Sequence, residues 1–170
     1  MPAGLPPVAT ADARVLVLGS LPGRVSIERQ QYYANPRNAM WDIVEQYLHV
    51  ARDQEYDSRA QSLQESGVAL WDVLAFAERK GSLDSAIVSG TEVPNDIVGF
   101  VREHPDVEVI LLNGSKAARL FRRFAQPALK AAGIQVGVIQ LPSTSPANTR
   151  YTAARKLKAW TPLVERLRGT

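Results

Sequence analysis

Four short apolar runs, separated by segments with helical patterning, limit the fold of this chain most strongly. They occupy residues 14–19, 68–70, 107–112 and 134–141. A run that is apolar at consecutive positions is typical of a strand buried on both faces. Strands that alternate with helices favour a parallel sheet covered on both sides. The sequence therefore predicts a three-layer α/β/α sandwich with a four-stranded parallel sheet.

The segments between these runs carry signals for the start and end of helices. Asn35 and Pro36 can cap and open a helix whose apolar stripe continues to Leu48. Further helices are expected at 57–65, 94–101, 115–124 and 152–168. The 170 residues fit one domain, which we place at 13–170 behind a flexible N-terminal arm at 1–12.

The composition removes several classes of site. There is no cysteine and there are only two histidines, so disulfides, thiolate metal sites and cysteine nucleophiles are excluded, and we expect no metal and no cofactor. No apolar run approaches the roughly 18 residues needed to span a bilayer, and the first ten residues do not resemble a secretory signal. We therefore expect a cytoplasmic protein without a membrane partner. A net charge of +3 permits a nucleic-acid partner without requiring one.

Three segments follow predicted strands at the edge where ligands bind in open parallel sheets, beyond the carboxyl ends of the strands. These segments are Gly19–Gly23, Asn113–Lys116 and Ser143–Asn148. The glycines after the first strand do not have the dinucleotide-binding spacing, and no loop ends in Lys-Ser or Lys-Thr. Neither His49 nor His104 is placed to serve a nucleophilic serine.

Two sets of residues at this edge resemble known motifs. One is Gly-Ser-Leu-Pro-Gly at 19–23, followed by Tyr-Tyr-Ala-Asn-Pro-Arg-Asn-Ala-Met-Trp at 32–41. The other is Leu-Pro-Ser-Thr-Ser-Pro-Ala-Asn at 141–148. They are similar to the two active-site motifs of the uracil-DNA glycosylase superfamily.

Three further motifs make the resemblance strongest to the hypoxanthine-DNA glycosylase branch. They are Leu-Trp-Asp-Val at 70–73, Gly-Ser-Leu-Asp-Ser at 81–85 and Pro-Asn-Asp at 94–96. The resemblance implies an enzyme that flips a deaminated base out of double-stranded DNA and hydrolyses its N-glycosidic bond, here releasing hypoxanthine from deoxyinosine. No lysine lies in the matched motifs to form an imine with the sugar, so we expect a monofunctional glycosylase that leaves an abasic site. We also expect a monomer without an obligate protein partner.

The resemblance implies that Asn38 is the catalytic residue. Much of the superfamily positions the attacking water from the turn after the first strand, but Ser20, Leu21 and Pro22 include no Asp or Asn. The hypoxanthine branch is thought to use the Asn of Pro-Arg-Asn, which is Asn38 here. An amide cannot be a strong base, although its carbonyl oxygen can orient a water. The alternative is that Asn38 only supports the first turn of its helix.

The expected base pocket consists of the turn after the first strand and two further side chains. Tyr33 can stack on the flipped base, and the amide of Asn113 can pair with a base edge. The alternatives are that Tyr33 packs in the core and that Asn113 forms a turn with Gly114. Asp72 could also enter the site, although an acid there more often caps a helix. The complete set is Gly19, Ser20, Leu21, Pro22, Gly23, Tyr33 and Asn113.

The loop after the last strand is expected to bind the DNA backbone and wedge into the duplex. Its small hydroxyl residues and prolines suit a close approach to phosphates, to which Lys116 and Arg150 can add positive charge. Superfamily members often have a His in this motif, and its absence here removes a cationic partner for the leaving base. The loop residues are Ser143, Thr144, Ser145, Pro146, Ala147 and Asn148.

Three other functions stay open at this point. The same pocket could excise uracil from G/U mispairs, or it could hydrolyse a small-molecule nucleoside. The chain could also be a DNA-binding module without catalysis.

Overall fold

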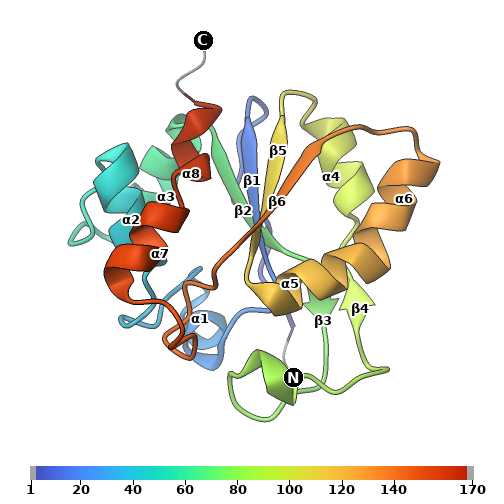
Figure 1. The fold of residues 1–170 in the computed structure, drawn as a ribbon, viewed down its shortest axis with the longest axis horizontal. Helices are drawn as coiled ribbons and strands as arrows, with labels where there is room; N and C mark the ends of the chain where they lie inside the picture. The colour runs from blue at the N-terminus through green and yellow to red at the C-terminus, as the bar shows by residue number, and fades with distance from the viewer. Residues whose placement is uncertain (1–2, 168–170) are drawn as a thin grey trace.

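The central sheet of the computed structural model has four parallel strands in the order β2-β1-β5-β6 (Figure 1). The structure describes residues 3–167. The predicted four-stranded parallel sheet is confirmed, although β6 begins three residues later than expected because the Ile134 amide donates to Leu129 O at a helix end. The strands are β1 (Val15–Gly19), β2 (Val68–Asp72), β5 (Val109–Asn113) and β6 (Gly137–Leu141).

Helices cover both faces of this sheet, as the three-layer prediction requires (Figure 1). Val15 and Val17 of β1 pack into one core cluster, while Leu16 and Leu18 pack into the other, so the strand is buried on both sides. One layer holds α2 (Met40–Leu48), α3 (Tyr56–Glu65), α7 (Ala153–Ala159) and α8 (Pro162–Glu165). The other holds α4 (Ile97–Glu103), α5 (Ser115–Leu120), a π-helical turn (Phe121–Ala125) and α6 (Gln126–Ala131).

Several predicted helices have different bounds, and local contacts explain two of these differences. The helix expected from Asn35 begins only at Met40, because Asn35 Oδ1 accepts a hydrogen bond from Arg37 N and closes a turn instead of capping α2. The helix expected at 152–168 begins with Thr152 as its cap, but it is divided into α7 and α8 before Pro162. Proline lacks the amide hydrogen that a continuous helix needs.

A small second sheet lies beyond the carboxyl end of β2 and was not predicted. Strand β3 (Leu74–Phe76) pairs antiparallel with β4 (Val93–Pro94), and a 3₁₀ turn (Asp84–Ala86) lies between them in the chain. A short helix, α1 (Arg24–Arg29), follows the turn after β1. Strands of two or three residues are too short to show a sequence period.

The segment before β1 lies against the sheet, in contrast to the flexible arm expected for residues 1–12. Val8 and Leu70 exchange backbone hydrogen bonds of 2.9 Å in both directions, and Gly4 N donates to Ala75 O at 2.7 Å. Leu5 is buried in the core. Residues 3–12 thus cover the edge of β2, while Met1 and Pro2 lie outside the described residues. Among the helices of residues 3–167, none is long and apolar enough to cross a membrane.

Candidate active site

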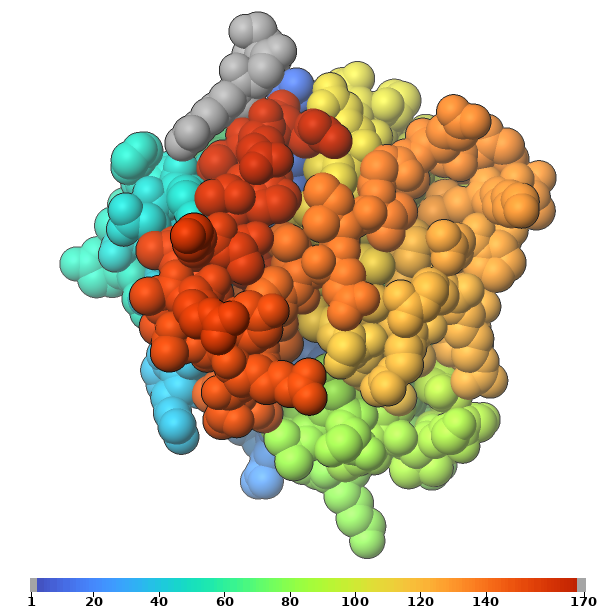
Figure 2. Space-filling view, viewed as in Figure 1, coloured from blue at the N-terminus to red at the C-terminus, as the bar shows by residue number. Residues whose placement is uncertain are grey.

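A pocket of about 720 Å³ opens at the carboxyl ends of the parallel strands. The segment around residues 80–90, green in Figure 2, and the orange-red segment after β6 approach one another on this part of the surface. Segments that are far apart in the sequence line it, including 19–26, 82–85 and 140–148. Of the site residues expected from the sequence, all line the pocket except Lys116, which is half-buried on α5.

The turn after β1 is held in place by side chains from the segment after β3. Ser20 Oγ donates a 2.5 Å hydrogen bond to Asp84 Oδ1. The guanidinium of Arg79 donates to the backbone carbonyls of Leu21 and Pro22. These contacts fix the Gly19–Gly23 turn without any acid in the turn itself, because the carboxylate comes from a distant loop.

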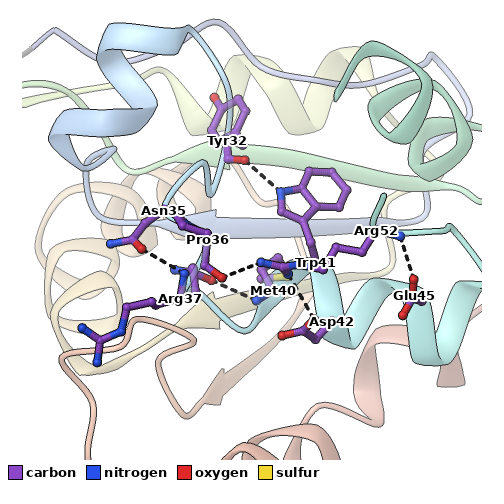
Figure 3. A network of polar contacts seen from close by, with 10 residues as sticks. Tyr32, Asn35, Pro36, Arg37, Met40, Trp41, Asp42, Glu45 and Arg52 are labelled. Atoms are coloured by element: carbon purple, nitrogen blue, oxygen red, sulfur yellow. Dashed lines mark hydrogen bonds and ion pairs between the residues drawn. The ribbon is translucent and has the colours of Figure 1, made fainter. Parts of the chain in front are cut away.

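The segment before α2 is fixed by a polar network (Figure 3). The indole nitrogen of Trp41 donates to Tyr32 O at 3.0 Å, which ties the start of α2 to the tyrosine pair. Arg52 donates to Pro36 O at 2.7 Å and forms an ion pair with Asp42 at 3.2 Å. The Pro-Arg-Asn turn is therefore anchored from outside the pocket.

Asn38 supports the start of α2 and also lies in the wall of the pocket. Its Oδ1 accepts a 2.9 Å hydrogen bond from Met40 N, so the side chain supports the first turn of α2. Asn38 also lines the pocket. An amide oxygen has two lone pairs, so the atom that accepts from Met40 N can accept from a water as well. The hydrogen bond from Met40 N sets the direction of the amide and leaves its oxygen able to accept a second hydrogen bond.

The two adjacent tyrosines point to different places. Tyr32 is buried and its hydroxyl donates to Pro6 O at 2.9 Å, whereas the hydroxyl of Tyr33 accepts from Asn113 Nδ2 at 3.3 Å. Tyr33 has a φ of 55°, an unusual left-handed conformation for a tyrosine. Burial raises the pKa of both phenols, so both are neutral. Both tyrosines line the pocket, and Tyr33 is the more exposed of the two.

Asn113 uses both ends of its amide within the protein. Its Nδ2 donates to Thr144 Oγ1 at 3.0 Å, and its Oδ1 accepts from Thr144 N at 3.0 Å. The residue is only 8% exposed. These bonds favour a role in positioning Thr144 and Tyr33 over direct pairing with a base edge.

The loop 143–148 is anchored on its inner side. Thr144 O accepts from Ala39 N at 3.0 Å, and Lys156 Nζ donates to Ser145 O at 3.0 Å. Gly114 has a φ of 97°, and a Cβ there would lie 2.9 Å from Ser143 Cβ, so glycine permits both the turn and the close approach. The loop thus joins β5, α2 and α7 while Ala147 stays exposed.

Two aspartates line the pocket, and the sequence analysis singled out only Asp72. Asp72 caps no helix and is 4% exposed. Burial and the negative charge of Asp84, opposed by Arg79, together raise its pKa to about 7. Burial also raises the pKa of Asp84, while the hydrogen bond from Ser20 and the charge of Arg79 lower it. Asp84 lay within the 81–85 motif, which was the one signal that could have found it.

Comparisons with known proteins identify the family of this chain. The model of the uracil DNA glycosylase superfamily matches residues 6–167. The hypoxanthine DNA glycosylase of Methanosarcina acetivorans is 36% identical over 154 residues, 90% of this chain and 92% of that protein. The protein of the same name from Methanosarcina barkeri is 32% identical over 154 residues, with the same coverage.

A solved structure has the same fold. The solution NMR structure of a protein from Methanosarcina acetivorans, described as a candidate uracil DNA glycosylase, superposes with a TM-score of 0.76 and 34% sequence identity. The match covers 92% of each chain. On the family match, the two relatives and this structure together, the chain belongs to the uracil DNA glycosylase superfamily.

Proposed function

We propose that this protein is a monofunctional DNA glycosylase that flips deoxyinosine out of double-stranded DNA and releases hypoxanthine, leaving an abasic site. The observation that carries the proposal is that both glycosylase motifs line one pocket, in a chain 36% identical to a hypoxanthine DNA glycosylase over 90% of its length. It acts as a monomer in the cytoplasm, with DNA as its partner and without a cofactor.

Asn38 orients the attacking water in the proposed mechanism. As the C1′–N9 bond breaks, positive charge develops on the deoxyribose and negative charge on the base. The water held by the Asn38 carbonyl oxygen adds to C1′. Because the Met40 amide and the Arg52 network fix the turn, the water is placed before the bond breaks. Positioning of this kind and the surrounding charges lower the barrier without a strong base.

The flipped base stacks on Tyr33, and the DNA backbone lies along the loop 143–148. A neutral aromatic ring is a suitable surface for a nucleobase of any kind. Arg150 is exposed at the end of the loop, and Lys116 lies on the adjacent α5, so both can approach phosphates. Contacts of this type position the duplex but do not identify the base.

The test is a cleavage assay on labelled duplexes that carry one deoxyinosine or one deoxyuridine, followed by alkali. We expect the deoxyinosine strand to break, and Asn38→Ala to lower the single-turnover rate by about 100-fold or more. Gln61→Ala, an exposed amide on α3, serves as the matched control and keeps the full rate.

Uracil excision is the second candidate, because the similar solved structure is described as a candidate uracil DNA glycosylase. Cleavage of the deoxyuridine strand alone would support it over hypoxanthine. Release of hypoxanthine from free inosine, independent of salt, would instead indicate a nucleoside hydrolase. Binding of the duplex without cleavage of either strand would indicate a DNA-binding module.

A further inference from the structure

The carboxyl group of Asp72 is the least satisfied polar group in the pocket. The side chain lies at the end of β2 and is more than nine-tenths buried, with 4% exposed. Within residues 3–167, its Oδ2 is buried and has no hydrogen-bond partner. A buried carboxylate without donors is strongly unfavourable, whereas a neutral carboxyl group is much less so. The environment therefore favours the protonated form.

The carboxyl group of Asp72 lies at the inner wall of the pocket. It is paired with Gly19 in the parallel register of β1 and β2. A Cβ on Gly19 would lie 2.5 Å from Asp72 Oδ1 and 3.6 Å from the hydroxyl of Tyr33. The carboxyl group and the ring expected to stack on the base thus approach the same point above Gly19.

The charged and titratable groups around Asp72 come from three elements. Burial raises the pKa of Asp72, and the negative charge of Asp84 in the 3₁₀ turn raises it as well. Arg79, from the segment after β3, acts in the opposite direction. The hydroxyls of Tyr32 and Tyr33, from the segment before α2, are neutral. With burial and Asp84 outweighing Arg79, Asp72 exchanges its proton near pH 7.

Among residues 3–167, no other group that lines the pocket is equally suited to protonate a leaving base. Thr144 lines the pocket, but its hydroxyl has no proton to give near neutral pH. His49 follows α2 and His104 stacks on Phe100, and neither lines the pocket. The Asp84 carboxylate is already bound to Ser20.

We propose that Asp72 is a second catalytic residue, whose protonated carboxyl group donates its proton to a ring nitrogen of the departing purine. The inference rests on the proposed function. When the C1′–N9 bond breaks, its electron pair stays with the base, and the proton of Asp72 moves to N7 or N3, so that neutral hypoxanthine leaves. Water adds to C1′ and loses a proton, which returns to the Asp72 carboxylate through solvent.

The test measures single-turnover release of hypoxanthine from duplex DNA between pH 5 and pH 9. For the wild type we expect the rate constant to fall about tenfold per pH unit above about pH 7. Asp72→Asn keeps the shape and a hydrogen-bond donor but has no transferable proton, so it should be about 100-fold slower at pH 6 and independent of pH. Asp106→Asn, a remote exposed aspartate, is the matched control.

A second measurement does not depend on activity or on the variant's yield. The ¹³C resonance of the Asp72 carboxyl in the wild-type protein should titrate near pH 7, and titration near pH 4 would overturn the inference. A flat wild-type rate profile, or a wild-type rate at pH 6 in Asp72→Asn, would overturn it while leaving the glycosylase function intact. Failure of the wild type to release hypoxanthine at any pH would overturn the proposed function and this inference together.

Discussion

Ser20 Oγ lies 2.5 Å from Asp84 Oδ1, although the two residues are 64 positions apart in the chain. Ser20 belongs to the turn after β1, where the matched motif lacks an acid, and Asp84 belongs to the 3₁₀ turn between β3 and β4. The hydrogen bond therefore connects the loop between β3 and β4 to the turn after β1, which lines the pocket.

Ser20→Ala should weaken both the fold and the pocket. It removes the donor to a largely buried carboxylate, so we expect the free energy of unfolding to fall by about 1–2 kcal/mol and base release to slow. Urea unfolding and single-turnover release measure the two effects. Ser89→Ala, an exposed serine nearby, is the control. In a cycle with Asp84→Asn the two changes should not be additive, and full additivity would show that the pair is not coupled.

Gly19 should tolerate no larger side chain while Asp72 is present. A Cβ would approach Asp72 Oδ1 to 2.5 Å, so Gly19→Ala should lower the free energy of unfolding by about 2 kcal/mol. The double variant Gly19→Ala/Asp72→Ala removes the clash and should be more stable than expected from the sum of the two single changes. Thermal unfolding of all three variants tests this, and strict additivity would contradict the close contact.

The sheet could be predicted because its signal is local and dense. β1 and β5 are apolar at every position up to their final Gly19 and Asn113, and burial on both faces requires that composition. The same prediction placed the segments after β1, β5 and β6 together, because parallel strands bring their carboxyl ends to one edge of the sheet. For this reason most of the expected pocket residues line one cavity.

The charges of the pocket could not be predicted in the same way. The burial of Asp84 depends on a loop that returns to Ser20 across 64 positions, and the strands that hold the loop are two and three residues long. Asn35 satisfied every local rule for a helix cap, but its side chain formed a turn with Arg37. Local capping rules do not distinguish a helix from a turn that precedes one.

Asp72 should make the stability of the protein depend on pH. Its pKa is about 7 in the folded protein against an ordinary 3.8, so between these values the folded state holds a proton that the unfolded state releases. The free energy of unfolding should therefore fall as pH rises, by up to about 3 kcal/mol between pH 5 and pH 8 from this group alone. Asp72→Asn has no such charge to bury, so its stability relative to wild type should improve from pH 5 to pH 8. Urea unfolding at both values, with Asp106→Asn as control, measures the difference; equal differences at both would contradict the assignment.

Lys156 should control the loop 143–148 without touching the DNA. Its side chain is buried on α7, burial lowers its pKa, and its Nζ donates to Ser145 O at 3.0 Å. Lys156→Met keeps the apolar stem but removes the donor, so the loop loses one of its inner anchors. We expect binding of the duplex to weaken by about tenfold, with a smaller change in the rate of base release once DNA is bound.

The neighbouring Lys158 provides a matched comparison, because it is exposed on the same helix. Lys158→Met removes the same charge from the protein without removing a hydrogen bond to the loop. If the role of Lys156 is to hold Ser145, the two variants should show the same dependence of binding on salt but different affinities. Equal affinities would show that only the charge of Lys156 matters. Each variant removes one positive charge, and the attraction of such a charge to the DNA phosphates does not depend on the DNA sequence.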